Sequence, residues 1–141
     1  MLNCLLVKIH FALMVMAKLL FVDDEQFILS GMERIFRFMA AELDVVFTSS
    51  SQEAVDMLKT DNFDVVISDM YMPDINGVEL LSKAKELQPE TIRIMLSGIL
   101  ENSLDAHQRK VAHLTLHKPI NAAKFIDTVR KCIAHKEQIV R

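Results

Sequence analysis

The chain is poor in the residues that build phosphate-binding loops and irregular structure. Its 141 residues include only three glycines, Gly31, Gly77 and Gly98, and three prolines. Glycines this far apart cannot form the Gly-x-Gly-x-x-Gly loop of dinucleotide-binding folds or a Walker loop. Collagen-like, linker and other low-complexity classes are excluded for the same reason.

The chain also has few cysteines and no run of basic residues. Cys4 and Cys132 are too few and too far apart for a disulfide scaffold or a zinc knuckle, so we expect a cytoplasmic protein. The 16 basic and 19 acidic residues give a net charge of −3, with no basic stretch that would follow a phosphate backbone. We therefore expect no direct contact between this domain and nucleic acid.

No apolar run is long enough to cross a membrane. Residues 1–17 are strongly apolar, but Lys8 and His10 interrupt them and Lys18 follows. A membrane span needs about 20 consecutive apolar residues, and a secretory signal needs a positively charged start and a longer apolar stretch. We expect residues 1–17 to be an apolar N-terminal extension, and we expect no membrane partner.

Apolar side chains at regular spacing are what the chain has in quantity. Hydrophobic residues make up 51% of it and charged residues 25%, enough to bury one core and cover it. Short apolar runs predict strands at residues 19–22, 43–47, 63–68, 92–96 and 111–116. Helical periodicity and capping residues predict helices at about residues 26–40, 51–60, 78–87, 100–109 and from 122 onward.

Five strands that alternate with five helices indicate a doubly wound α/β domain over residues 18–135. Such βαβ connections produce a parallel sheet with helices on both faces. Apolar residues continue at heptad-like spacing through Ile133 to Val140, so residues 136–141 are expected to extend the last helix. This extension would lead toward an output domain, pair in a homodimer, or be a plain terminal helix that frays.

Polar side chains stand at the carboxyl ends of four predicted strands. The first strand is followed by Asp23 and Asp24, the third by Asp69, the fourth by Ser97 and the fifth by Lys118. Ligands of such sheets bind at this edge, so the side chains should converge there. Each residue alone has an ordinary explanation as a cap, a turn or a surface charge.

Together, these residues predict a cation site. Two carboxylates about 4 Å apart repel by about 4 kcal/mol at an effective dielectric constant near 20, so several of them need compensating positive charge. Lys118 would supply one charge. Carboxylate oxygens completed by water suit Mg²⁺, which also binds phosphate oxygens of a substrate.

Four segments at these strand ends resemble the response-regulator receiver domains of two-component phosphorelay systems. They are FVDDE at residues 21–25, DMYMPDING at 69–77, MLSG at 95–98 and LHKP at 116–119. They occur in the order of that family and at about its spacing, over roughly residues 18–135. The resemblance implies a flavodoxin-like five-stranded parallel sheet of order 2-1-3-4-5 with five helices.

The resemblance also implies a role for each residue. Asp69 would be the phosphoacceptor, taking the phosphoryl group from a sensor histidine kinase or a phosphotransfer protein. Asp24, Asp69 and the backbone carbonyl of Tyr71 would bind Mg²⁺ directly, and Asp23 through water. A domain of this kind catalyses only its own phosphorylation and slow dephosphorylation.

Two further residues would bind the phosphoryl group once it is attached. The resemblance implies that Lys118, before a cis Lys-Pro bond, pairs with one phosphoryl oxygen and that the Ser97 hydroxyl bonds another. Movement of Ser97 would repack an output surface made by the fourth helix, the fifth strand and the fifth helix. The fifth strand departs from the family pattern because Thr115 stands where an aromatic residue is common.

Three alternative functions compete with this interpretation. A haloacid-dehalogenase-like phosphatase would need a second aspartate two residues after Asp69, where this chain has Tyr71. His113 and His117 could share one side of a strand as zinc ligands, although a third ligand is missing nearby. A pseudo-receiver that binds partners without being phosphorylated stays the main alternative.

Overall fold

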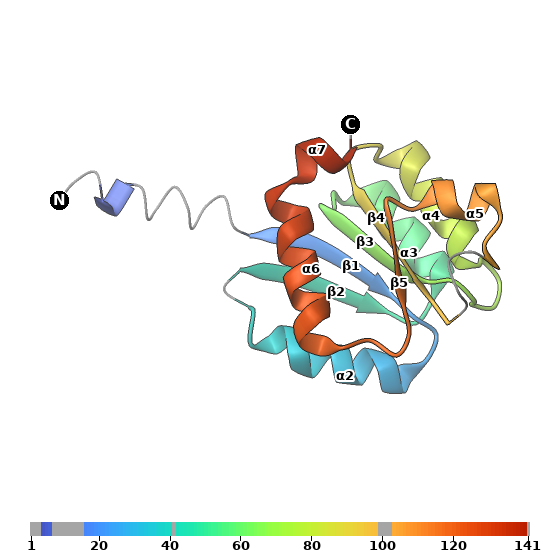
Figure 1. Cartoon of the computed structure of the whole chain (residues 1–141), viewed down its shortest axis with the longest axis horizontal. Coiled ribbons are helices and arrows are strands. Elements are labelled where there is room, and N and C mark those ends of the chain that lie inside the picture. Colours follow the sequence, from blue (N-terminus) through green and yellow to red (C-terminus); the bar gives the residue numbers. More distant parts are fainter. Residues whose placement is uncertain (1–3, 7–15, 41, 99–102, 141) are drawn as a thin grey trace.

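The computed structural model describes residues 4–6, 16–40, 42–98 and 103–140. Its centre is a parallel sheet with the strand order β2-β1-β3-β4-β5 (Figure 1). This confirms the fold class and the strand order expected from the sequence. The strands are β1 (Ala17–Val22), β2 (Leu43–Thr48), β3 (Val65–Asp69), β4 (Ile92–Ser97) and β5 (Leu114–His117).

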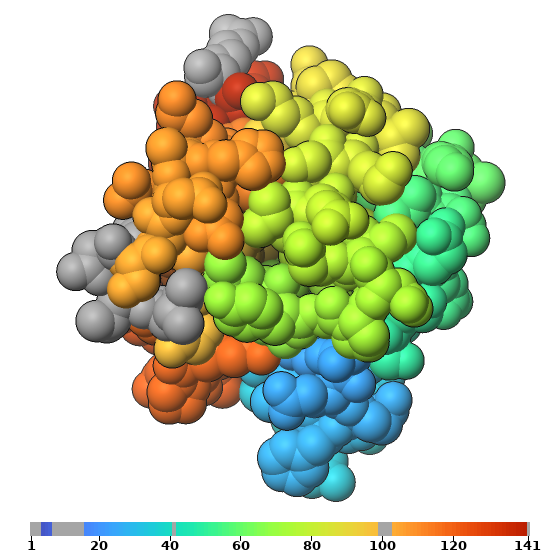
Figure 2. All heavy atoms as spheres, turned by 90° about the vertical axis from the view of Figure 1, so that its right-hand side faces the viewer, coloured from blue at the N-terminus to red at the C-terminus, as the bar shows by residue number. Residues whose placement is uncertain are grey.

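Helices cover both faces of the sheet. Helices α2 and α6 lie on one face, and α3, α4 and α5 lie on the other (Figures 1 and 2). These helices and the one that follows them are α2 (Gln26–Arg37), α3 (Ser51–Thr60), α4 (Gly77–Leu87), α5 (Ala106–Val111), α6 (Ala122–Ala134) and α7 (Lys136–Val140). Among the described residues, none of the helices is long and apolar enough to span a membrane.

Alternating side chains of the central strands divide the core in two. In β4, Ile92 and Ile94 face α2 and α6, whereas Met95 belongs to the cluster under α3, α4 and α5. Every residue of β3 and β4 is buried, as expected of strands covered on both faces. This alternation also determines the side of the sheet to which each side chain at a strand end points.

The expected number of helices was wrong. Besides α2 to α6, the described residues contain α7 and a helical turn at residues 4–6, which makes seven helices where five were expected. Helix α6 ends at Ala134, and the backbone N–H of His135 bonds back to the carbonyl of Lys131. The predicted continuous last helix is therefore broken at His135.

Helix α7 packs against the core of the domain instead of continuing α6 in the same direction. Lys136 Nζ lies 3.0 Å from Asp64 Oδ1, and Ile139 and Val140 pack against the core under α2 and α6. Burial of these two apolar side chains favours the bend over a straight, solvent-exposed extension. The sequence predicted helical structure here but not this change of direction.

Two boundaries also differ from those expected. Val111 ends α5 instead of starting the fifth strand, which begins at Leu114. A reciprocal capping box between Asp105 and Gln108 starts α5 at Ala106, later than predicted. Residues 99–102, which include the expected start of this helix, lie outside the described residues.

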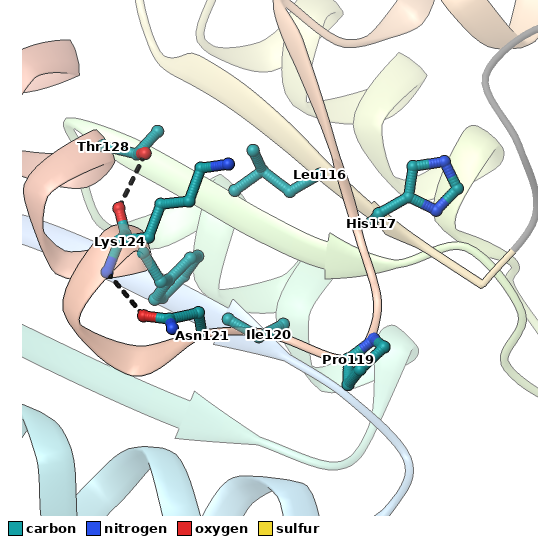
Figure 3. Close-up of a pocket in the computed structure, with 8 residues that line it drawn as sticks. Leu116, His117, Pro119, Ile120, Asn121, Lys124 and Thr128 are labelled. Carbon is teal, nitrogen blue, oxygen red and sulfur yellow. Dashed lines mark hydrogen bonds between the residues drawn. The ribbon is translucent and has the colours of Figure 1, made fainter.

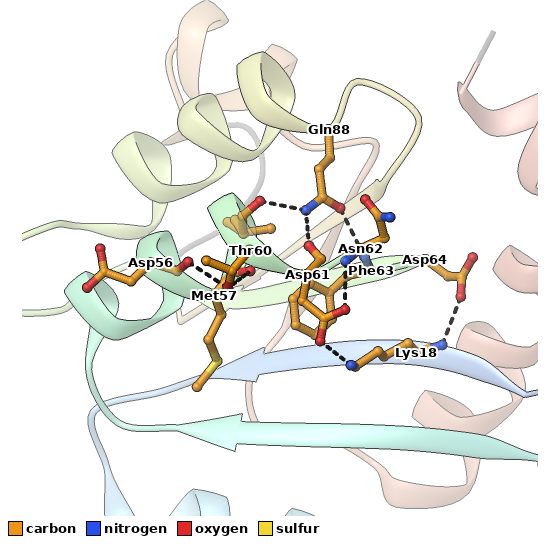
Figure 4. A network of polar contacts seen from close by, with 10 residues as sticks. Lys18, Asp56, Met57, Thr60, Asp61, Asn62, Phe63, Asp64 and Gln88 are labelled. Atoms are coloured by element: carbon orange, nitrogen blue, oxygen red, sulfur yellow. Dashed lines mark hydrogen bonds and ion pairs between the residues drawn. The ribbon is translucent and has the colours of Figure 1, made fainter.

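A polar network joins the strands at their amino ends (Figure 4). The backbone N–H of Lys18 donates to Asp64 Oδ2 at 2.8 Å, and the Lys18 ammonium pairs with Asp61. Gln88, at the end of α4, accepts from the N–H of Phe63 at 2.9 Å. These contacts hold the start of β3 against β1 and α4, at the edge opposite the carboxyl ends.

His113 helps to align β4 with β5. Its Nδ1 accepts a 2.9 Å hydrogen bond from the backbone N–H of Arg93, so the ring must be neutral at that nitrogen. Burial, reinforced by the positive charges of Arg93 and Lys85, lowers the pKa of His113 to about 4. Below its unfolded pKa of 6.5, the unfolded chain thus binds the proton more readily than the folded chain.

We expect replacement of His113 by asparagine to flatten the pH dependence of stability. The wild-type free energy of unfolding should fall by about 2 kcal/mol relative to the variant between about pH 7 and pH 4. The amide oxygen of the introduced side chain can keep accepting from Arg93 at every pH. Urea unfolding at several pH values measures this; His107→Asn, at an exposed position on α5, is the matched control.

Candidate functional site

The five residues singled out at strand ends all lie at the carboxyl edge of the sheet, and the side chains of four of them, Asp23, Asp24, Asp69 and Lys118, come together there. Asp69 and Ser97 are the last residues of β3 and β4, and Asp23 and Lys118 directly follow β1 and β5. Because all strands are parallel, their carboxyl ends meet at the same edge. The space-filling view shows the β1–α2 region below the helices of the α3–α5 face (Figure 2).

Lys118 connects two carboxylates at this edge. Its Nζ lies 3.1 Å from Asp69 Oδ1 and 3.3 Å from Asp23 Oδ2. Its backbone N–H donates to the Ser97 carbonyl at 2.9 Å, which ties the residue to the end of β4. The Lys118–Pro119 peptide bond is cis, as the resemblance implied.

The pKa values reflect how the charges are buried. Burial raises the pKa of Asp23, which is fully buried, against the opposing effects of the Glu25 N–H and Lys118. Burial also acts to lower the pKa of Lys118, but its hydrogen bond to Asp69 and the two negative charges raise it overall. Lys118 is therefore held in its charged form beside Asp69.

The carboxylates suit a divalent cation. Ligand oxygens of Asp23, Asp24 and Asp69 all lie within 4.8 Å of one another, the only such group among the residues that the structure describes. Asp24 is exposed, whereas Asp69 is only 6% exposed, so the cluster opens toward solvent on one side. An all-oxygen group with room for water fits Mg²⁺. His113 and His117 form no such group, and the zinc alternative loses its support.

The connection from β3 to α4 is held tightly under Asp69. A Cβ on Gly77 would overlap the carbonyl oxygen of Asp69 and lie 2.9 Å from Met70 Cα. The N–H of Gly77 donates to the Met70 carbonyl, and Asp74 has a positive φ of 66°. Tyr71, between these points, is 62% exposed. Only glycine allows α4 to start this close to the backbone of Asp69.

Two contacts in this region had no signal in the sequence. Buried Ser51 donates to the Pro73 carbonyl at 3.4 Å and accepts from the Ile75 N–H at 3.3 Å, so α3 braces the loop after Asp69. The Ser97 hydroxyl donates to Met70 Sδ at 3.6 Å. Both contacts join segments that are far apart in the chain, and periodicity and motif spacing report only on local order.

A family model described as the response regulator receiver domain matches residues 19–130. The chain belongs to this family. The receiver domain is 31% identical over 122 residues to the uncharacterized transcriptional regulatory protein YesN of Bacillus subtilis. It is 31% identical over 119 residues to the hydrogenase transcriptional regulatory protein HoxA of Cupriavidus necator.

These matches cover most of the receiver domain but a minor part of each relative. They span 84% and 83% of this chain, and 33% and 24% of the two relatives. The receiver domain covers less than two thirds of the curated relatives that it matches first.

Solved structures agree with the fold. A CheY-like receiver domain protein from Methanospirillum hungatei JF-1 has a TM-score of 0.79 at 24% identity, over 87% of this chain and 98% of its own. A receiver domain protein from Clostridium thermocellum has a TM-score of 0.75 at 29% identity, over 88% of this chain and 99% of its own. The receiver domain thus has the same architecture as these structures over nearly their full length.

Replacing Gly77 by alanine should destabilise the receiver domain by about 2 kcal/mol, because the new methyl group overlaps backbone and not a flexible side chain. Gly31→Ala is the opposite case, since nothing lies within 4 Å of its Cβ position in the middle of α2. That control should stabilise by up to about 1 kcal/mol through helix propensity. Urea unfolding measures both, and equal effects would contradict the close packing at Gly77.

Proposed function

We propose that this receiver domain accepts a phosphoryl group on Asp69 from the phosphohistidine of a sensor histidine kinase or a phosphotransfer protein. One observation carries the proposal: Lys118 contacts both Asp69 and Asp23 within a cluster of three carboxylates at the sheet edge. A structural ion pair would need one carboxylate. A lysine shared by two, beside a third that is exposed, suits a site that receives more negative charge.

In the transfer step, a carboxylate oxygen of Asp69 attacks the phosphorus, and the bond from phosphorus to the donor's imidazole nitrogen breaks. The imidazole leaves with that electron pair, and an acyl phosphate forms on Asp69. Nucleophile and phosphoryl group are both anionic, so positioning and charge neutralisation contribute most to such a step. Lys118 Nζ, 3.1 Å from Asp69 Oδ1, provides positive charge where the phosphoryl oxygens arrive.

Asp24, Asp69 and the backbone carbonyl of Tyr71 are the proposed ligands of Mg²⁺, with Asp23 contacting the ion through water. The bound ion would supply positive charge to the phosphoryl oxygens during transfer. Asp23 is held by the Glu25 N–H at 2.9 Å and by Lys118, so its carboxylate is oriented before any ion binds. Gly77 and Ser51 fix the loop that carries the Tyr71 carbonyl.

The attached phosphoryl group adds about two negative charges at the edge. We propose that the Ser97 hydroxyl then bonds a phosphoryl oxygen and that the change repacks an output surface of α5, β5 and α6. A pocket of about 250 Å³ lies on this surface and is lined by residues that include Leu116, His117 and Lys124 (Figure 3). Thr115 takes the place of the usual aromatic residue, so this switch works without an aromatic rotamer change.

The proposed partners follow from the same chemistry. The phosphoryl donor is a histidine kinase or phosphotransfer protein, and the effector is an output domain, a separate protein or a second copy in a homodimer. The matched relatives named as transcriptional regulatory proteins are much longer than the matched region, which supports an output domain for this family. We place this signalling in the cytoplasm, with autophosphorylation from small donors and slow dephosphorylation as the domain's own reactions.

Incubation with acetyl phosphate and Mg²⁺ should add the mass of one phosphoryl group to the wild-type domain and none to Asp69→Asn. Asp74→Asn is the matched control, because Asp74 is an exposed carboxylate in the next loop and asparagine tolerates its positive φ. Intact-mass spectrometry gives the result. If the wild type gains no phosphoryl group, the domain is an interaction module; equal gain in Asp69→Asn would mean another acceptor.

Mg²⁺ alone should raise the melting temperature of the domain, because only the folded state brings the carboxylates together. At 100 times its dissociation constant, a ligand specific to the folded state stabilises by about 2.7 kcal/mol. Asp24→Asn should lose most of this gain, whereas Asp44→Asn, at an exposed position on β2, should keep it. Scanning calorimetry with and without Mg²⁺ measures the gain, and an unchanged response of Asp24→Asn would exclude Asp24 as a ligand.

A further inference from the structure

The hydroxyl of Ser97 has a sulfur partner in the structure. Ser97 Oγ donates to Met70 Sδ at 3.6 Å, within the longer range of hydrogen bonds to sulfur. Both residues are buried: Ser97 is fully buried, and Met70 is 2% exposed. Met70 directly follows Asp69, so this contact ties the hydroxyl at the end of β4 to the residue next to the proposed phosphoacceptor.

Met70, the partner of the Ser97 hydroxyl, lies on the other side of the sheet from the Asp69 side chain. Side chains alternate between the two faces along a strand. Val65 and Ile67 of β3 face α2 and α6, so the side chain of Asp69, two residues further on, points to the same face. In β4, Met95 faces α3, α4 and α5, so the side chain of Ser97, two residues further on, points to that face as well. Met70 lies on the same face. The Ser97 hydroxyl must therefore turn away from Met70 before it can bond a group on Asp69.

We propose that Met70 is a positioning residue that holds the Ser97 hydroxyl in the resting state and opposes its turn toward the phosphoryl group. This inference rests on the proposed function of Asp69. Sulfur is a weak acceptor, so the hold is small and the phosphoryl oxygens, which are charged, outcompete it. Met70 thus contributes a small part of what keeps the unphosphorylated domain from adopting the switched arrangement.

The first test uses the domain without metal or phosphate. Replacing Ser97 by alanine removes the hydroxyl, so the ¹³C NMR shift of the Met70 ε-methyl group should change. The ε-methyl of Met95, a fully buried methionine of the same cluster, is the internal reference. A Met70 signal that moves no more than that of Met95 would contradict the contact.

The second test measures binding of beryllium trifluoride, a phosphoryl mimic, in the presence of Mg²⁺. Met70→Leu keeps a buried side chain of similar volume but removes the acceptor. Met70→Leu should tighten binding by about two- to threefold. This is the low end of the change in affinity expected when one hydrogen bond that opposes binding is removed. Met95→Leu is the matched control and should bind as the wild type does. NMR titration of the Gly98 amide follows the binding.

A double-variant cycle separates this role from a packing effect. In the Ser97→Ala background, Met70→Leu should change the affinity no further, because no hydroxyl is left to hold. An equal gain with and without Ser97, or a gain shared by Met95→Leu, would overturn the inference. If the wild type fails to bind the mimic at all, the proposed phosphorylation of Asp69 fails instead, so the two failures are distinguishable.

Discussion

The contact of Lys118 with Asp23 and Asp69 is the constraint to which the rest of the site is adjusted. Without it, two largely buried carboxylates would be held close together, and two carboxylates 4 Å apart repel by about 4 kcal/mol at an effective dielectric constant near 20. Lys118 can reach both because β5 ends beside β4, where its backbone N–H bonds Ser97. The strand order thus determines which positive charge lies beside the carboxylates of Asp23 and Asp69.

The loop after Asp69 is held in place by contacts of a different kind. Contacts with backbone, and not with charge, hold it: Gly77 lies against the Asp69 carbonyl, and Ser51 bridges Pro73 and Ile75. Charge can therefore change at the Asp69 carboxylate while its main chain stays in place. Under the proposed function, side chains would move to meet the phosphoryl group, and the loop would serve as a fixed support.

The sequence was sufficient to predict the sheet and the placement of Asp23, Asp24, Asp69, Ser97 and Lys118 at one edge of it, because periodicity locates the strand ends of a parallel sheet. It failed where tertiary contacts decide. The bend at His135 depends on the ion pair between Lys136 and Asp64. The contact between Ser97 and Met70 depends on the register between β3 and β4. At Val111, where the apolar pattern suggested a strand, the chain is still in α5, the helix that Asp105 caps.

The shortness of β5 has a consequence for recognition. This strand has four residues, forms one edge of the sheet and is followed within two residues by Pro119, which lacks an N–H. Short edge strands and prolines discourage another chain from adding a strand. A molecule that binds beside β5 therefore finds little main chain to pair with and must be selected by side chains. Such a surface can change its binding partner by point substitution while the architecture of the sheet is preserved.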